Sequence, residues 1–133
     1  SHWAFALSES QFMGASIQDQ LWQLQRKIIL ELAEKETCVI VGRCADVILK
    51  DHADCLTAFI HARKEKRMKR IVEVYGETDV AIEKRIRDKD KRRAVYYEFY
   101  TGQTWGLAEN FHVALDSGEL GIERCVNILA DLY

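Results

Sequence analysis

Four consecutive apolar residues, Cys38 to Val41, restrict what this chain can fold into. Three of them are β-branched, and polar Thr37 and Gly42 bound the run, which is typical of a strand buried on both faces of a parallel sheet. We therefore predict a central strand at residues 38–41. Gly42 permits a tight turn, so Arg43 follows just beyond the carboxyl end of that strand.

The position of Arg43 suggests a residue that binds an anion. Ligands of open α/β sheets bind at the carboxyl ends of the strands. A guanidinium group there can hold a phosphate or a carboxylate through two parallel hydrogen bonds. The alternative is an ordinary surface arginine, and spacing alone leaves both interpretations open.

The apolar pattern of the whole chain predicts helices alternating with strands. Strands separated by helices are expected to be parallel and covered on both faces, so we predict an α/β fold and one domain over residues 1–133. The predicted order is a helix of about five turns from Ser16, the strand at 38–41, a short helix at 45–49, a strand at 56–61, a basic helix at 63–75, a helix from about 80 to 100, a strand at 111–116 and a helix at 121–132.

Two of these helices carry a stripe of apolar residues. In the first helix, Ser16 has the position of an N-cap, and the stripe recurs every three or four residues, at Ile17, Leu21, Leu24, Ile28 and Leu32. In the basic helix the expected buried edge is Met68, Ile71, Val72 and Tyr75, and Gly76 ends the helix. Thr78 or Asp79 is expected to cap the next helix.

The composition of the chain argues against nucleic-acid binding and membrane association. The net charge is -2, which implies no general attraction to nucleic acid or to an anionic membrane, and no apolar run approaches the roughly 20 residues of a membrane-spanning helix. The four cysteines form no CxxC pair, so we expect buried free thiols, no metal site and a cytoplasmic location. They are Cys38, Cys44, Cys55 and Cys125.

Positive charge gathers in one part of the chain. Residues 63–93 hold 13 of the 19 lysines and arginines. Within this window Lys89, Arg93 and either Tyr96 or Tyr97 share one helix face. A solvated surface is the usual meaning of such a run, and binding of nucleic acid with stacking of bases on the tyrosines is a less favoured alternative. A movable cationic segment that closes over a transferring phosphoryl group would have the same composition.

Three segments together resemble the cytidylate kinase-like family, nucleoside monophosphate kinases of the P-loop class. The similarity runs from about residue 16 to the end, and its most distinctive part is YY-x-x-Y-T-G-x-x-W-G. The segments are CVIVGRCADVIL at 38–49, IRDKDKRRAVYYEFYTGQTWG at 86–106 and LGIERCVNIL at 120–129. The resemblance implies a three-layer doubly wound parallel sheet, with a helical lid at about residues 77–106.

The resemblance also implies an activity and the residues that carry it. The γ-phosphoryl group of ATP would be transferred to a nucleoside monophosphate, with CMP or dCMP favoured and Mg²⁺ bridging the phosphates. Arg43 would hold the acceptor phosphate, and Asp90 and Arg93 match a D-x-x-R-A motif that acts around the acceptor nucleotide. Lys89 stands where cytidylate kinases proper carry an arginine that meets the transferring phosphate; a lysine keeps the charge but loses the planar fork.

One part of the family pattern has no counterpart in the sequence. No GxxxxGK[ST] loop is present, although such a loop cradles the ATP phosphates in this class. We expect these 133 residues to be part of a longer kinase whose first strand and helix, carrying that loop, lie upstream. The alternatives are a non-catalytic nucleotide-binding or interaction domain, or a homo-oligomer in which another protomer fills the gap in the sheet.

Overall fold

The chain folds into two compact units, residues 1–52 and 53–133, which are described in turn. The computed structural model describes the backbone of residues 2–52 and 54–133, and the side chains of residues 17–52 and 54–133. It is mostly helical, with one parallel sheet of two strands among the described residues. The class is therefore α/β, as predicted, whereas the three-layer doubly wound sheet is not formed by the described residues.

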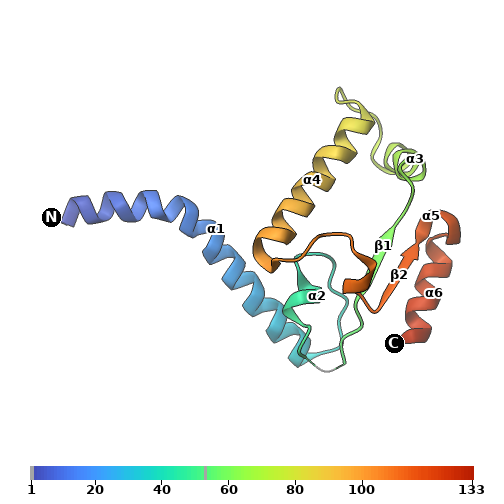
Figure 1. The fold of residues 1–133 in the computed structure, drawn as a ribbon, viewed down its shortest axis with the longest axis horizontal. Helices are drawn as coiled ribbons and strands as arrows, with labels where there is room; N and C mark the ends of the chain where they lie inside the picture. The colour runs from blue at the N-terminus through green and yellow to red at the C-terminus, as the bar shows by residue number, and fades with distance from the viewer. Residues whose placement is uncertain (1, 53) are drawn as a thin grey trace. The chain divides into compact units, whose positions relative to one another are not determined.

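The first unit is built from two helices that contact each other (Figure 1). Helix α1 (His2–Lys35) confirms the predicted helix but begins well before Ser16, which therefore lies inside it. Helix α2 (Ala45–Ile48) confirms the short helix predicted after Arg43. The buried side chains of this unit come from both helices and the turns beside α2, and they are Ile29, Cys44, Ala45, Ile48 and Leu49.

The apolar stripe of α1 is exposed in this structure. Its five residues are exposed, from 38% at Leu32 to 59% at Leu21, and Ile29 on another face is buried instead. Periodic spacing identifies the residues that share a helix face, but it does not show that another element covers that face. The stripe is therefore an open apolar surface in this structure.

The predicted central strand at 38–41 is also wrong. These residues form no strand, and Val39 and Val41 are 93% and 86% exposed. A strand exists only where a neighbour satisfies its backbone groups, and the sheet of the described residues contains only β1 and β2. A β-branched composition suits a sheet, but without a neighbouring strand among the described residues it forms none.

The second unit is organised around two parallel strands that lie side by side (Figure 1). Strand β1 (Ala58–His61) and strand β2 (Val113–Asp116) pair in register from Ala58 opposite Val113 to His61 opposite Asp116. Both strands and their parallel direction were predicted. An aromatic cluster packs beside β1, where the Phe59 ring centroid lies 5.8 Å from that of Trp105 and 5.2 Å from that of Phe111.

Two longer helices connect the strands. Helix α3 (Lys64–Tyr75) ends at Gly76, whose φ of 74° suits glycine, as predicted. The predicted buried edge is only partly buried: Met68, Ile71 and Val72 are half-buried, and Tyr75, the last residue of the helix, is 74% exposed, so the burial predicted for Tyr75 is wrong. Helix α4 (Ile82–Thr101) has Ala81 at its N-cap, so the capping role predicted for Thr78 or Asp79 is wrong.

Three short elements complete the second unit. They are the 3₁₀ helix η1 (Ala108–Asn110), helix α5 (Ser117–Leu120) and helix α6 (Ile122–Leu132). Ile86 and Tyr97 of α4 are buried, as are Leu115 of β2 and Cys125 of α6. Asp116, the last residue of β2, is the N-cap of α5: its carboxylate accepts hydrogen bonds from the backbone N–H groups of Gly118 and Glu119.

We expect Asp116→Ala to lower the free energy of unfolding by about 1 kcal/mol, because two backbone donors at the start of α5 lose their acceptor. Asp116→Asn keeps an acceptor oxygen and should cost less than about 0.5 kcal/mol. Denaturant unfolding measures both. Asp131→Ala, at an exposed position on α6, is the matched control; equal effects of the two alanine variants would contradict the capping role.

Candidate functional site

The structure brings two of the predicted site residues together in one charged cluster. Asp90 of α4 accepts hydrogen bonds from both terminal nitrogens of Arg67 on α3, Nη1 to Oδ2 at 2.8 Å and Nη2 to Oδ1 at 2.7 Å. Arg93, one turn further along α4, donates from Nη1 to the same Oδ1 at 3.1 Å. One carboxylate is thus shared by two guanidinium groups, one from each helix.

The cluster keeps Asp90 ionised. The hydrogen bonds from Arg67 lower the pKa of the Asp90 carboxyl below its ordinary value of 3.8; burial opposes this effect and Arg93 adds to it. Because the folded-state pKa lies below that of the unfolded chain, the ionised carboxylate stabilises the fold above pH 3.8, and this contribution is lost as the pH falls further. Asp90 therefore acts as an anion at neutral pH.

The two arginines differ in exposure. The Arg67 side chain is 31% exposed, whereas that of Arg93 is 54% exposed. Arg93 uses one donor on Asp90, so most of the five N–H donors of its guanidinium group can reach a ligand. Arg93 is therefore the member of the cluster best placed to bind an anion from solvent.

The other residues of the predicted lid have separate surroundings. Lys89 is exposed on α4. Arg85 donates from Nη1 to the carbonyl oxygen of Gly76 at 3.0 Å, which fastens α4 to the end of α3. Tyr97 is buried and its hydroxyl lies 3.3 Å from Oε1 of Gln103. Of the two tyrosines considered with Lys89 and Arg93, Tyr97 therefore belongs to the core.

Arg43 lies in the first unit, in an unusual backbone conformation. Gly42, Arg43 and Cys44 have φ angles of 70°, 59° and 57°, three successive residues in the left-handed region. Only Gly42 adopts that region without steric cost, and a non-glycine residue there costs about 1–2 kcal/mol. Such conformations cluster at ligand-binding positions. Arg43 is exposed, and its predicted position opposite the cationic lid stays a prediction.

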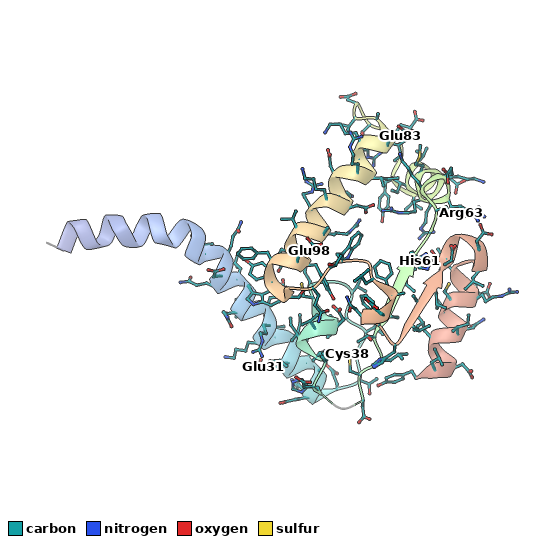
Figure 2. The ribbon with its side chains drawn as sticks, viewed as in Figure 1. Glu31, Cys38, His61, Arg63, Glu83 and Glu98 are labelled. Atoms are coloured by element: carbon teal, nitrogen blue, oxygen red, sulfur yellow. The ribbon has the colours of Figure 1, made fainter. Side chains whose placement is uncertain are left out.

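The cysteines divide into exposed and buried thiols. Cys44 and Cys125 are buried, Cys55 is half-buried, and all four are free. Cys38 is exposed, so the prediction of a buried thiol is wrong at this position. Like Val39 and Val41, it belongs to the segment that pairs with no described strand; Figure 2 shows it after α1. Burial, and secondarily Asp46, raises the pKa of the Cys44 thiol to about 11, while Arg43 opposes the shift.

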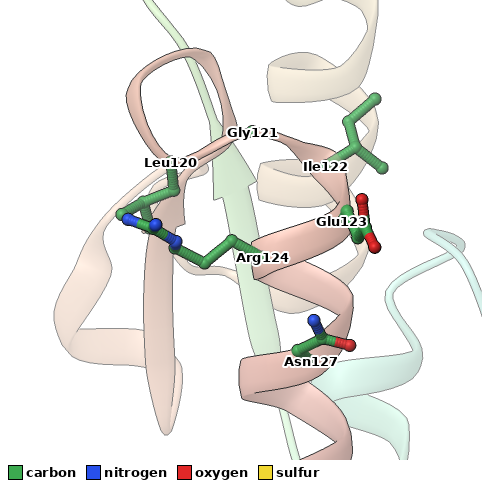
Figure 3. Close-up of a pocket in the computed structure, with 6 residues that line it drawn as sticks. All are labelled: Leu120, Gly121, Ile122, Glu123, Arg124 and Asn127. Atoms are coloured by element: carbon green, nitrogen blue, oxygen red, sulfur yellow. The ribbon is translucent and has the colours of Figure 1, made fainter.

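Other parts of the surface offer little chemistry. Among the described side chains, those of residues 17–52 and 54–133, no group of three His, Cys, Asp or Glu residues is arranged to hold a metal ion. No described helix is both long and apolar enough to cross a membrane. A hollow of about 450 Å³ lies where α5 meets α6 (Figure 3), and it contains none of the predicted site residues. It is lined by Leu120, Gly121, Ile122, Glu123, Arg124 and Asn127.

Sequence reasoning missed Arg67 as a site residue. It is one of six lysines and arginines between residues 63 and 70, and nothing in their order marks it. Arg63 and Lys66 lie near Glu119 instead, at 4.0 and 3.8 Å between the charged atoms. A helical wheel of α3 does not single out Arg67 either: Arg67 borders the apolar edge through Ile71, four residues on, but Lys64 does so through Met68 in the same way.

Comparison with known proteins places these residues in a family. The model of the cytidylate kinase-like family matches residues 1–119, so the match begins before residue 16 and ends before the 120–129 segment. A similar solved structure is that of an uncharacterized protein from Eubacterium ventriosum ATCC 27560, with 31% sequence identity and a TM-score of 0.73. The match covers 84% of this chain but 61% of that protein, which is therefore longer. No curated protein matches.

Two variants distinguish the effect of the left-handed backbone conformation of Arg43 on stability from the effect of its charge. Arg43→Gly and Arg43→Ala both remove the guanidinium group, but only glycine relieves the strain, so we expect the glycine variant to be more stable by about 1 kcal/mol. Arg43→Ala should stay within about 0.5 kcal/mol of the wild type, because alanine keeps the strain. Denaturant unfolding measures the difference, and equal stability of the two variants would contradict the conformation.

The thiols should differ in reactivity. At pH 8 we expect iodoacetamide to modify exposed Cys38 readily and to leave Cys44 unmodified, because buried Cys44, with its pKa near 11, is only about 0.1% thiolate at that pH. Peptide mass spectrometry identifies the modified positions. Labelling in guanidinium chloride, where all four thiols should react, is the control; equal rates at Cys38 and Cys44 in the folded protein would show that Cys44 is accessible.

Proposed function

Since this chain belongs to the cytidylate kinase-like family, we propose that it supplies acceptor-binding and lid residues of a nucleoside monophosphate kinase. The observation that carries the proposal is the shared carboxylate of Asp90. It holds Arg93 from one side while more than half of the Arg93 side chain stays exposed. A guanidinium group fixed in this way is suited to bind phosphate oxygens.

The proposed reaction is transfer of the γ-phosphoryl group of ATP to CMP or dCMP. Catalysis in this class comes from positioning and from neutralising charge on the phosphoryl oxygens. Arg43 would hold the acceptor phosphate, and Arg93 and Lys89 would neutralise charge on the transferring group. Lys89 can supply charge but not a bidentate contact, so we assign the directional contact to Arg93.

The described residues do not fit the ATP and Mg²⁺ part of the site. Mg²⁺ in such sites takes one or two carboxylates together with phosphate oxygens. Asp90, the carboxylate of the cationic cluster, already has both oxygens bound to Arg67. We therefore place the ATP and Mg²⁺ site in a further segment of a longer protein, a proposal supported by the greater length of the solved relative.

The exposed apolar surfaces favour a second candidate function. Val39 and Val41 are exposed in a segment that pairs with no strand among the described residues, and the apolar stripe of α1 is exposed too. Segments of this kind can add a strand from a partner. The second candidate is therefore an interaction domain on the same fold, without catalysis.

A coupled assay of ADP release separates the two candidates. CMP, dCMP, UMP and AMP are offered with Mg²⁺-ATP to this chain and to a form extended upstream. We expect activity in the extended form with a cytidine nucleotide, and a loss of at least about 100-fold in its Arg43→Ala and Arg93→Met variants, since each removes a charged phosphate contact.

Arg70→Met in the same extended form is the control, because exposed Arg70 has no hydrogen bond or ion pair to other described residues. It should keep its activity within about twofold. An extended form that is folded but inactive with all four acceptors would reject the kinase and leave the interaction domain.

A further inference from the structure

We propose that Arg67 is a positioning residue for nucleotide binding, and that it acts through Asp90 on Arg93. The proposal rests on the function proposed above. The family resemblance drew attention to Asp90 and Arg93, whereas Arg67 enters only through the contacts between α3 and α4.

Arg67 fixes the position of the Asp90 carboxylate. Arg67 binds both oxygens of Asp90, so the carboxylate can neither rotate nor shift without breaking a hydrogen bond. Oδ1 is also the acceptor of Arg93, at 3.1 Å. The place of this oxygen, and with it the place of the Arg93 guanidinium group, is therefore set by Arg67.

Arg67 also affects the charge of the cluster. Asp90 alone would neutralise Arg93, and a neutral pair attracts an anion only weakly. With Arg67 present, one carboxylate serves two guanidinium groups, so the cluster carries a net charge of about +1. Because Arg67 is the less exposed partner and Arg93 the more exposed one, a ligand from solvent would meet the charge at Arg93.

The ion pairs of α3 distinguish Arg67 from neighbouring cations. Arg63 and Lys66 are within ion-pair distance of Glu119, and Lys69 of Glu73 on its own helix. Among the residues that the structure describes, Arg67 is the cation of α3 with an ion pair to α4. The planar guanidinium group of Arg67 donates two parallel hydrogen bonds to the Asp90 carboxylate, and a lysine at the same position could not form both.

The experiment is a double-mutant cycle on the full-length protein, with CMP as the probe and titration calorimetry as the measurement. We expect Arg67→Met to weaken CMP binding by about tenfold or more, and Arg67→Lys to weaken it by a smaller factor. In an Asp90→Leu background, the same Arg67→Met change should alter affinity by less than about threefold, because the connection to Arg93 is already lost. Arg70→Met is the control and should stay within about twofold.

A second measurement tests the contact between Arg67 and Asp90 in the absence of any ligand. Carbon-13 NMR titration of the Asp90 carboxyl should show its pKa returning toward the ordinary value in Arg67→Met, while Arg70→Met leaves it low. A thermal melt of each variant shows whether it is folded, and Arg67→Lys serves in the cycle if Arg67→Met does not fold.

The outcomes separate the two proposals. Wild-type binding of CMP that Arg67→Met leaves unchanged would overturn the role of Arg67 and leave the proposed function standing. Equal losses in both backgrounds would mean that Arg67 contacts the nucleotide directly, which also overturns it. A folded wild type that binds none of CMP, dCMP, UMP and AMP, with the low pKa of Asp90 intact, would reject the proposed function, and the role of Arg67 in binding with it.

Discussion

Parallel pairing of β1 with β2 governs the second unit. Parallel strands cannot be joined by a tight turn, so the chain must leave the end of β1 and return to the start of β2 through a long connection. Helices α3 and α4 are that connection. The pairing therefore brings the two helices together, and with them the carboxylate of Asp90 and the guanidinium groups on either side of it.

The charged cluster shows how packing converts a basic segment into a site. Most cations between residues 63 and 93 are solvated or pair with acids on their own helix, as Lys84 does with Asp88. Such exposed pairs contribute little to stability. The contact between α3 and α4 shields the Asp90 carboxylate partly from water, and both Arg67 and Arg93 donate hydrogen bonds to it. The guanidinium group of Arg93 is thereby held in one orientation, in a cluster with a net positive charge.

Local signals in the sequence predicted much of the fold. The apolar run around Phe59, the alternation around Leu115 and the glycine after Tyr75 each determine an element within a few residues, so β1, β2 and the end of α3 were predicted correctly. Burial depends on elements far away in the sequence. Val39 was therefore predicted to be buried and is exposed, and Arg67 could not be recognised before its partner on α4 was known.

The open segment at residues 38–41 also bears on how this chain behaves in solution. Residues 38–41 are mostly β-branched and mostly exposed, and they pair with no strand among the described residues, so backbone N–H and C=O groups lie open beside apolar side chains. Such a segment can pair with the same segment of another copy. This pairing is favoured more strongly as the protein concentration rises. Residues 38–41 are therefore the segment at which we would expect self-association of the isolated chain to begin.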